Sequence, residues 1–278
     1  HKTLVLIDIL NEEFDHPAYP YEKLALAKAL VNTISNLHFG PEVGVKQIKS
    51  DAPVVQPWLQ AVKQIATDLE AQHTPTTTPS SVYLADARDA SIILEPSSID
   101  AVITSPPYPN EKDYTRTTRL ESVLLGFMED KGALRRFKQH LVRSNTRNVY
   151  VADKDDVWVE GFDEIQELAE KIETRRIAMG KESGFERLYA RTTKLYFGGM
   201  ARHLAGLRTA LRPGAHLAYV VGDQASYLQV MIRTGKLLAD IAQSLGYEVV
   251  SIDLFRTRLA TATREQLREE VVVLKWNP

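Results

Sequence analysis

The pattern of apolar and polar positions changes character at about residue 82. From there onward, short apolar runs alternate with long amphipathic stretches. Strands are predicted over 81–86, from residue 98 to the prolines at 106–107, over 216–222, after Gly246 and over 269–276. Such runs are typical of a parallel α/β sheet whose strands are buried on both faces.

Two long helices are predicted in this second part of the chain. Leucines recur at near-helical spacing through 184–211, and the helix is expected to end at Arg212-Pro213-Gly214 because proline cannot continue it. A second helix over 234–245 ends at Gly246. The alternating run 269–276 predicts a last strand antiparallel to its neighbour, and 254–270 is interpreted as a loop before it.

The first 81 residues give a weaker pattern. Residues 2–9 have the pattern of a strand that ends near Asp8, whereas 21–37 and 55–72 have helical spacing. The Thr/Pro/Ser-rich segment 73–81 is interpreted as an exposed linker. We therefore expect a helical region 1–81 that includes this linker, and a core 82–278 that carries a helical insertion over 111–183.

Composition narrows the class of protein. The chain has 278 residues, 44% of them hydrophobic, a net charge of −2 and no cysteine. The charge excludes a globally basic polyanion binder, and the lack of cysteine excludes disulfides, a thiol nucleophile and cysteine-based zinc sites. No apolar run approaches the ~20 residues of a membrane span and no leader opens the chain, so a soluble, cytoplasmic protein without a metal is expected.

The stretch "IDAVITSPPYPNEKDYTR" (99–116) carries the main chemical signal. A tight proline turn with a surface tyrosine is the plain interpretation. However, ligands of open α/β sheets bind beyond the carboxyl ends of the strands, where this segment is expected. Pro106 and Pro107 remove two backbone donors and leave acceptors. Ser105 and the Pro106 carbonyl are therefore candidates to hold an amino group, while Tyr108 stacks on a flat ring.

The sequence "TSPPY" (104–108) resembles the catalytic motif of the S-adenosylmethionine-dependent DNA amino-methyltransferases. "LADARD" (84–89) and "LRPGAHLAYVVGD" (211–223) resemble further parts of that family. The resemblance covers about residues 80 to 278. It implies a class I methyltransferase (Rossmann-like) α/β fold, with a mostly parallel sheet, an antiparallel last strand and a helical insertion. By this analogy the insertion 111–183 is the target-recognition element, and the region 1–81 forms part of the cofactor side.

The resemblance also implies roles for individual residues. Ser105, Pro106, Pro107 and Tyr108 would act on a flipped base, and the Ser-Pro-Pro-Tyr form is most typical of enzymes for N4 of cytosine, with N6 of adenine as the other target. S-adenosylmethionine is the implied cofactor and DNA the implied partner. The cofactor would be contacted by residues at the ends of the early strands, namely Asp86, Ala87, Thr104 and Asp8. Asp8 is equally an ordinary helix cap.

The chain departs from the family in one respect. The Phe-x-Gly-x-Gly cofactor loop is absent from the sequence. Three explanations stay open: the loop lies upstream of His1, a partner chain supplies it, or the protein binds without catalysing. An upstream loop is favoured, because the chain does not begin with methionine.

Candidate DNA contacts follow the motif and line the predicted rim. They are Asn110, Lys112, Tyr114, Arg116, Arg119, Arg135, Arg136, Asp223 and Gln224. The basic stretch 134–150 also contains Lys138, Arg143 and Arg147, and a solvated helical face is the competing interpretation. Asp223 and Gln224 either line a base pocket or cap the next helix. Arg256, Arg258 and Arg264 either meet phosphate or balance nearby glutamates.

Three functions are therefore compared. The first is a DNA amino-methyltransferase that serves host modification or partners a restriction or defence system. The second is an RNA or protein amine methyltransferase, and the third is a non-catalytic DNA-binding subunit. Cofactor binding separates the third from the other two.

Overall fold

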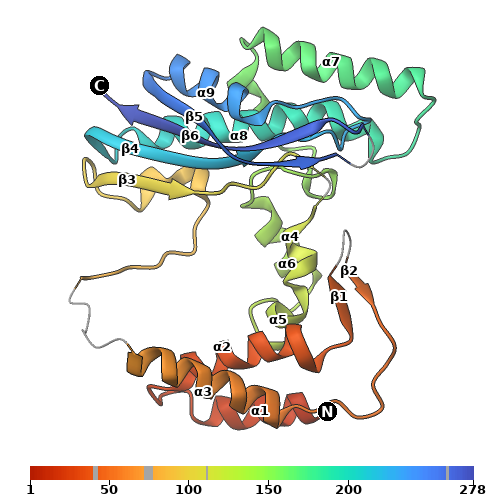
Figure 1. Cartoon of the computed structure of the whole chain (residues 1–278), viewed down its shortest axis with the longest axis vertical. Coiled ribbons are helices and arrows are strands. Elements are labelled where there is room, and N and C mark those ends of the chain that lie inside the picture. Colours follow the sequence, from red (N-terminus) through yellow and green to blue (C-terminus); the bar gives the residue numbers. More distant parts are fainter. Residues whose placement is uncertain (40–42, 72–77, 111, 261–262) are drawn as a thin grey trace. The chain divides into compact units, whose positions relative to one another are not determined.

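The computed structural model of the chain describes residues 1–39, 43–71, 78–110, 112–260 and 263–278. The chain divides into two compact units, which Figure 1 shows in one colour ramp from red to blue. The first comprises His1–Tyr83 and Tyr114–Phe137, and the second comprises Leu84–Asp113 and Lys138–Pro278. Residues 114–137, expected within an insertion of the core, thus group with the N-terminal region. Residues 73–77 of the expected linker lie outside the described residues.

The first unit is mainly helical. Its elements are α1 (Lys2–Glu12), α2 (Tyr19–Ala29), β1 (Leu37–Phe39), β2 (Val43–Val45), α3 (Val55–Ala71), α4 (Tyr114–Thr117), α5 (Arg119–Leu124) and the start of α6 (Lys131–Gln139). The helices expected over 21–37 and 55–72 are confirmed as α2, which continues in a π turn over Leu30–Ile34, and as α3. Leu6, Leu10, Leu26, Leu30 and Leu125 form the core of this unit.

The strand expected over residues 2–9 is wrong, because these residues form α1. Leu6 and Leu10 are one helical turn apart and are the buried positions of this helix, whereas Leu4 and Ile9 are about half exposed. The short run of apolar residues suits both a strand and a helix, and packing against α2 decided between them. Asp8 consequently lies exposed within a helix and does not follow a strand.

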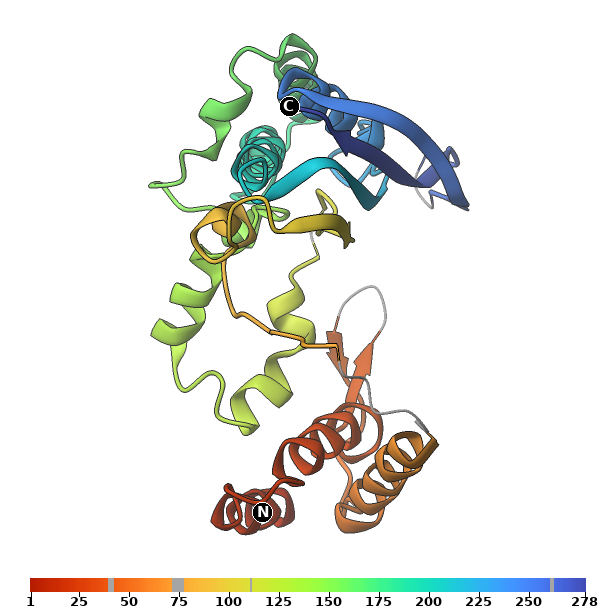
Figure 2. The same cartoon turned by 90° about the vertical axis from the view of Figure 1, so that its left-hand side faces the viewer.

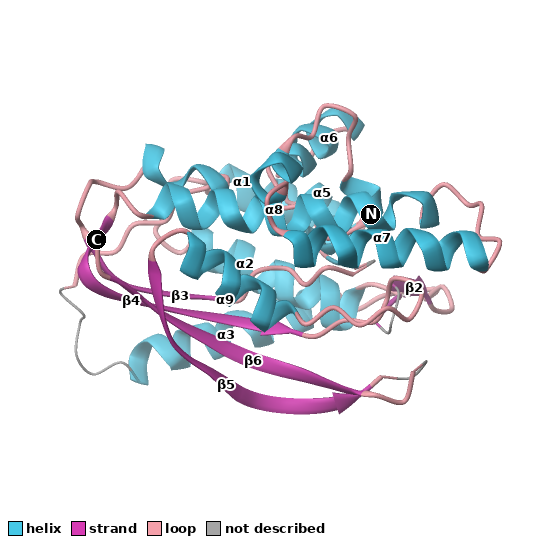
Figure 3. Ribbon diagram, turned by 90° about the horizontal axis from the view of Figure 1, so that it is seen from above, coloured by secondary structure: helices cyan, strands magenta, loops and turns pink. Residues whose placement is uncertain are grey.

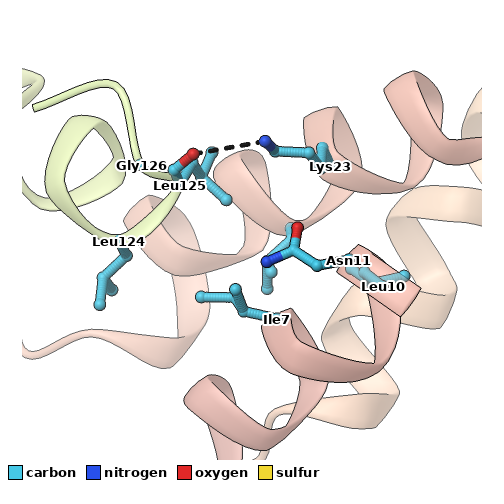
Figure 4. Close-up of a pocket in the computed structure, with 8 residues that line it drawn as sticks. Ile7, Leu10, Asn11, Lys23, Leu124, Leu125 and Gly126 are labelled. Carbon is cyan, nitrogen blue, oxygen red and sulfur yellow. Dashed lines mark hydrogen bonds between the residues drawn. The ribbon is translucent and has the colours of Figure 1, made fainter. Parts of the chain in front are cut away.

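A small pocket in the first unit lies between α1, α2 and the turn after α5 (Figure 4). It is lined by Ile7, Leu10, Asn11, Lys23, Leu26, Leu124, Leu125 and Gly126. The Lys23 ammonium donates to the Leu125 carbonyl at 3.3 Å and lies 5.2 Å from the ring centroids of both Tyr19 and Phe127. This lysine therefore joins α2 to the turn that ends α5.

The second unit is built on a four-stranded sheet, drawn in magenta in Figure 3. The strands are β3 (Ile99–Thr104), β4 (Leu211–Gly222), β5 (Tyr247–Leu259) and β6 (Gln266–Trp276), in the order β3-β4-β6-β5. β3 is parallel to β4, and β6 is antiparallel to both β4 and β5. Three strands therefore run in one direction and only the last is reversed, which confirms the expected α/β sheet with its antiparallel last strand.

Two helices cover one face of this sheet. Leu204 of α8 (Tyr189–Leu207) and Leu238 of α9 (Thr234–Ser244) share a core with Leu217, Tyr219 and other inward residues of the strands. In Figure 2 the teal α8 lies beside β4, and the blue β5–β6 hairpin extends as a long curved ribbon. Outside α8 lies α7 (Asp163–Ala178). These helices hold the sheet, and its carboxyl edge positions the candidate site.

Three further boundaries differ from expectation. Residues 81–86 are not a strand, and Val82 and Leu84 are 97% and 93% exposed. In the described sheet β3 is an edge strand, and this segment does not pair with its free edge. The helix before β4 ends at Leu207, because β4 already begins at Leu211 and includes Pro213. The loop expected over 254–270 is instead largely the β5–β6 hairpin, since β5 extends to Leu259.

The described residues contain no helix that is long and apolar enough to cross a membrane. They also contain no group of three or more histidine, aspartate or glutamate side chains arranged to hold a metal ion.

Candidate active site at the carboxyl edge of the sheet

The Ser-Pro-Pro-Tyr segment lies where β3 ends. Thr104, its last strand residue, is level with Tyr219 of β4, so residues 105–108 follow alongside the end of β4. Ser105 is exposed, while Pro106, Pro107 and Tyr108 are half-buried. The sheet thus brings the segment to the edge at which the parallel strands of α/β sheets bind their ligands.

Tyr108 packs against a glycine at the end of β4. A Cβ atom placed on Gly222 would lie 2.9 Å from Cε2 of Tyr108 and 3.2 Å from its Cζ. Any side chain at position 222 would therefore push the ring away. Sequence reasoning assigned Gly222 to a strand and missed this role, since no sequence signal relates residue 222 to residue 108.

A row of residues extends from this glycine across the sheet. Gly222 pairs with Glu269 of β6, and Glu269 pairs with Arg256 of β5. The side chain of Glu269 is 7% exposed and accepts from Nε of Arg256, and its second oxygen lies 3.4 Å from Nε of Arg258. The hydrogen bond and charge of Glu269 raise the pKa of Arg256, and Tyr108 adds to this effect. Tyr108, Glu269 and Arg256 are therefore neighbours.

The residues after the motif are fixed to a second loop. The Asn110 backbone N–H donates to the Ser144 carbonyl at 2.8 Å, and its side-chain oxygen accepts from the Lys112 N–H at 2.8 Å. The buried Asp113 carboxylate pairs with Lys138 at 2.7 Å. Asn110 is thus 7% exposed and serves its own loop, which holds the segment after Tyr108 in place.

Asp223 and Gln224, both expected at the rim, are almost completely buried. One Asp223 oxygen accepts from the Arg233 guanidinium and from the Arg268 backbone N–H. Gln224 exchanges two backbone hydrogen bonds with Ile232. Among the described side chains, Oδ1 of Asp223 and Nε2 of Gln224 have no hydrogen-bond partner. These residues close the end of β4, and their contact with a base remains a prediction.

Asp86, the acid expected at the cofactor, already has a partner. It accepts from the backbone N–H of Arg88 at 3.0 Å and from the guanidinium of the same residue. Arg88 is 6% exposed and also pairs with Asp155. Burial disfavours the charged carboxylate, but the hydrogen bonds and charge of Arg88 outweigh it and lower the pKa of Asp86. The observed role of Asp86 is to cap the turn that begins at Ala87.

His203 of α8 fixes the same turn to the sheet. Its Nδ1 is 2.7 Å from the Ala87 carbonyl, which only accepts, so Nδ1 carries the proton. Nε2 therefore accepts from the Tyr219 hydroxyl at 2.8 Å. Burial lowers the pKa of His203, although the Ala87 hydrogen bond and Asp86 oppose the shift. The imidazole is neutral in this arrangement.

The free energy of unfolding should consequently depend on pH near neutrality. Because the folded pKa of His203 lies below the unfolded value of about 6.5, the folded state binds fewer protons, and stability decreases as the pH falls below about 6.5. His203→Gln should reduce this dependence. Urea unfolding at a series of pH values from 8 to about 5 measures it. An equal slope of the free energy of unfolding against pH in the wild type and the variant would show that His203 does not cause the pH dependence.

The remaining candidates are distributed over both units. Lys138 and Arg143 of the basic stretch are nearly buried and pair with Asp113 and Asp153, so they do not form part of an open basic face. Lys112 is exposed in the second unit. Asp8, the expected cofactor contact, lies in the first unit. The other candidate DNA contacts also belong to the first unit, namely Tyr114, Arg116, Arg119, Arg135 and Arg136. The contact of these five residues with DNA remains a prediction.

Curated proteins similar to this chain are type II methyltransferases. The type II methyltransferase M.AvaI of a Nostoc species is 30% identical over 188 residues, which are 63% of this chain and 37% of that protein. The type II methyltransferase M.BsoBI of Geobacillus stearothermophilus is 26% identical over 234 residues, 78% of this chain and 45% of that protein. The chain therefore spans less than half the length of the curated relatives it matches. No protein-family model matches it.

Solved structures with some likeness come from a provisionally assigned DNA modification methylase of Thermus thermophilus. One of them contains S-adenosyl-L-methionine, is 13% identical, and matches with a TM-score of 0.35 over 70% of this chain and 54% of that one. A selenomethionine form of the same protein gives a TM-score of 0.32 at 13% identity.

Proposed function

We propose that this chain, which is similar to type II methyltransferases, transfers a methyl group from S-adenosylmethionine to an exocyclic amine of a base in DNA. N4 of cytosine is the proposed target, because the motif begins with Ser105. The observation that carries the proposal is the place of this motif: Ser105 to Tyr108 follow β3 at the carboxyl edge, with the Tyr108 ring packed on Gly222.

The cofactor and the chain's own residues would contribute differently to the reaction. S-adenosylmethionine supplies an electrophilic methyl group when it is bound. The chain's own contribution is to hold the amine. Its N–H groups donate hydrogen bonds to the Ser105 hydroxyl and the Pro106 carbonyl, which favours a nitrogen whose lone pair is available. Tyr108 provides the face on which the flipped base stacks. Of the expected cofactor contacts, Thr104 lies at this edge, whereas Asp86 is engaged by Arg88.

A second candidate function is favoured by two observations. Asp86 is already paired with Arg88, and the sequence has no Phe-x-Gly-x-Gly loop. The chain would then bind DNA as a subunit of a modification system and leave the cofactor to another polypeptide. A restriction or defence-system partner belongs with either candidate.

Calorimetric titration with S-adenosylmethionine separates the two candidates. An enzyme should bind the cofactor with a dissociation constant in the micromolar range, that is, roughly −8 kcal/mol. Thr104→Val, which removes a hydroxyl at the edge of the site, should weaken that binding, while the exposed Asp100→Asn at the opposite end of β3 should not. No heat of binding with any of these proteins would favour the DNA-binding subunit.

The packing of the Tyr108 ring on Gly222 predicts that Gly222→Ala lowers both activity and stability. The added methyl group lies 2.9 Å from the Tyr108 ring and 3.2 Å from Cγ of Glu269, so the ring must shift. We expect about a tenfold lower rate of methyl transfer and a loss of roughly 1–3 kcal/mol in the free energy of unfolding. Gly161→Ala, which meets open space, is the matched control. Wild-type activity in Gly222→Ala would show that methyl transfer does not depend on the packing of the Tyr108 ring against Gly222.

A further inference from the structure

Glu269, which lies beside Gly222 and the Tyr108 ring, forms ion pairs with Arg256 and Arg258. We call these three residues the Glu269 triad. Glu269 is 7% exposed, while the side chains of Arg256 and Arg258 are 65% and 42% exposed. One buried negative charge thus faces two positive charges, and the triad keeps a net charge of +1 on a chain whose total is −2.

The contacts within the triad determine which atoms face outward. Glu269 reaches both guanidinium groups through Nε. A guanidinium has five N–H donors in a planar fork, and a contact through Nε uses one of them and leaves the Nη groups for a ligand. Paired Nη donors on a fixed plane match the oxygens of a phosphate. Because Glu269 restricts both arginines, less conformational freedom is lost on binding.

The triad is on the same face of the sheet as Tyr108. Gly222, Glu269 and Arg256 are register partners across β4, β6 and β5, and register partners point to the same face. Strands are about 4.8 Å apart, so Arg256 is two strands, or about 10 Å, from the glycine under the ring. A nucleotide whose base stacks on Tyr108 has its own phosphates within that range.

We propose that the Glu269 triad binds backbone phosphates of DNA beside the base held at Tyr108, with Arg256 and Arg258 as the contacting residues. This inference rests on the proposed function for its partner, and extends it by assigning the backbone contact to the β5–β6 hairpin. Such contacts fix the position of the nucleic acid and carry no sequence information.

A similar arrangement on the opposite face provides a matched control. Arg268 is 47% exposed and is held through Nε by the nearly buried Glu270 at 2.7 Å. Residues 268 and 270 alternate with Glu269 along β6, and the Glu270 carboxylate reaches Gly235 at the start of α9, on the helix-covered face. Arg268→Gln removes a similar arginine from a face without the motif.

The test is the salt dependence of binding to a fluorescein-labelled DNA duplex, measured by anisotropy on the 278-residue chain. The Arg256→Gln/Arg258→Gln variant should bind more weakly to every sequence. Its slope of log K against log salt should fall by about 1.8, because each phosphate that an arginine neutralises accounts for about 0.9. Arg268→Gln should leave the slope unchanged. Circular dichroism should show that all variants are folded.

Each other outcome overturns the inference. These outcomes are an unchanged slope in the double variant, an equal loss in Arg268→Gln, no binding of DNA, and tighter binding of an RNA duplex. Methyl transfer is measured separately on the same proteins. If the wild type is inactive but the double variant has the reduced salt slope, the proposed function is contradicted and the phosphate contact of the triad is supported. If the wild type is fully active but the slope is unchanged in the double variant, the proposed function is supported and the phosphate contact is contradicted.

Discussion

Replacing Tyr108 with alanine is expected to lower the rate of methyl transfer to DNA by about 10- to 100-fold. Stacking of a base on an aromatic side chain contributes roughly 1–3 kcal/mol, and the ring on Gly222 is the proposed stacking surface. Because the ring is half-buried at the edge of the sheet, the fold should tolerate its removal. Single-turnover transfer from tritiated S-adenosylmethionine to DNA measures the rate.

Tyr108→Phe is the matched control, because it keeps the aromatic face and removes only the hydroxyl. Activity within a few-fold of the wild type in Tyr108→Phe, together with the loss in Tyr108→Ala, would identify the ring as the active feature. An equal loss in both variants would instead assign the effect to the hydroxyl group.

Gly198→Ala is expected to lower the free energy of unfolding of the second unit by roughly 3 kcal/mol or more. Gly198 lies in α8, where a Cβ atom would overlap the backbone carbonyl of Asp155. A backbone atom cannot move aside like the end of a side chain, so α8 or the turn that begins at Asp155 must shift. Denaturant unfolding followed by circular dichroism measures the loss.

The neighbouring Gly199→Ala shows whether the helix itself causes the effect. Its added methyl would meet Cγ1 of Val142 at 3.3 Å, a side-chain atom that can move. Alanine also favours a helix over glycine by about 1 kcal/mol, so this variant should be nearly neutral. A similar destabilisation in both variants would contradict the proposed overlap with Asp155.

The elements that could be predicted from the sequence are those whose spacing matches a single period. The amphipathic helix ending at Gly246 and the alternating strand 269–276 both have a distinct period and an end signal, and both are confirmed. The run at residues 2–9 is too short for its period to decide, and its contacts with α2 made it helical. Residues 81–86 have the composition of a strand but pair with no strand of the described sheet, and local composition does not specify strand pairing.

The candidate site divides in a similar way. The position of Ser105 to Tyr108 at the end of a strand follows from the apolar run and the two prolines, so it could be predicted. The ion pair of Asp86 with Arg88 could not be predicted. The sequence around an acid that follows a strand-like run does not show whether an arginine two residues later forms a hydrogen bond with it. Gly222 and Glu269 depend on strand register, which local sequence does not specify.

The most direct test of the proposed activity is mass spectrometry of DNA after incubation with the 278-residue chain and S-adenosylmethionine that carries a trideuterated methyl group. Nucleoside digestion should yield trideuterated N4-methylcytosine with the wild type, and about 10- to 100-fold less with Tyr108→Ala. Label on the exocyclic nitrogen of adenine would keep the reaction class and change the base. Label on a ring carbon, or unmodified DNA, would contradict an amine methyltransferase.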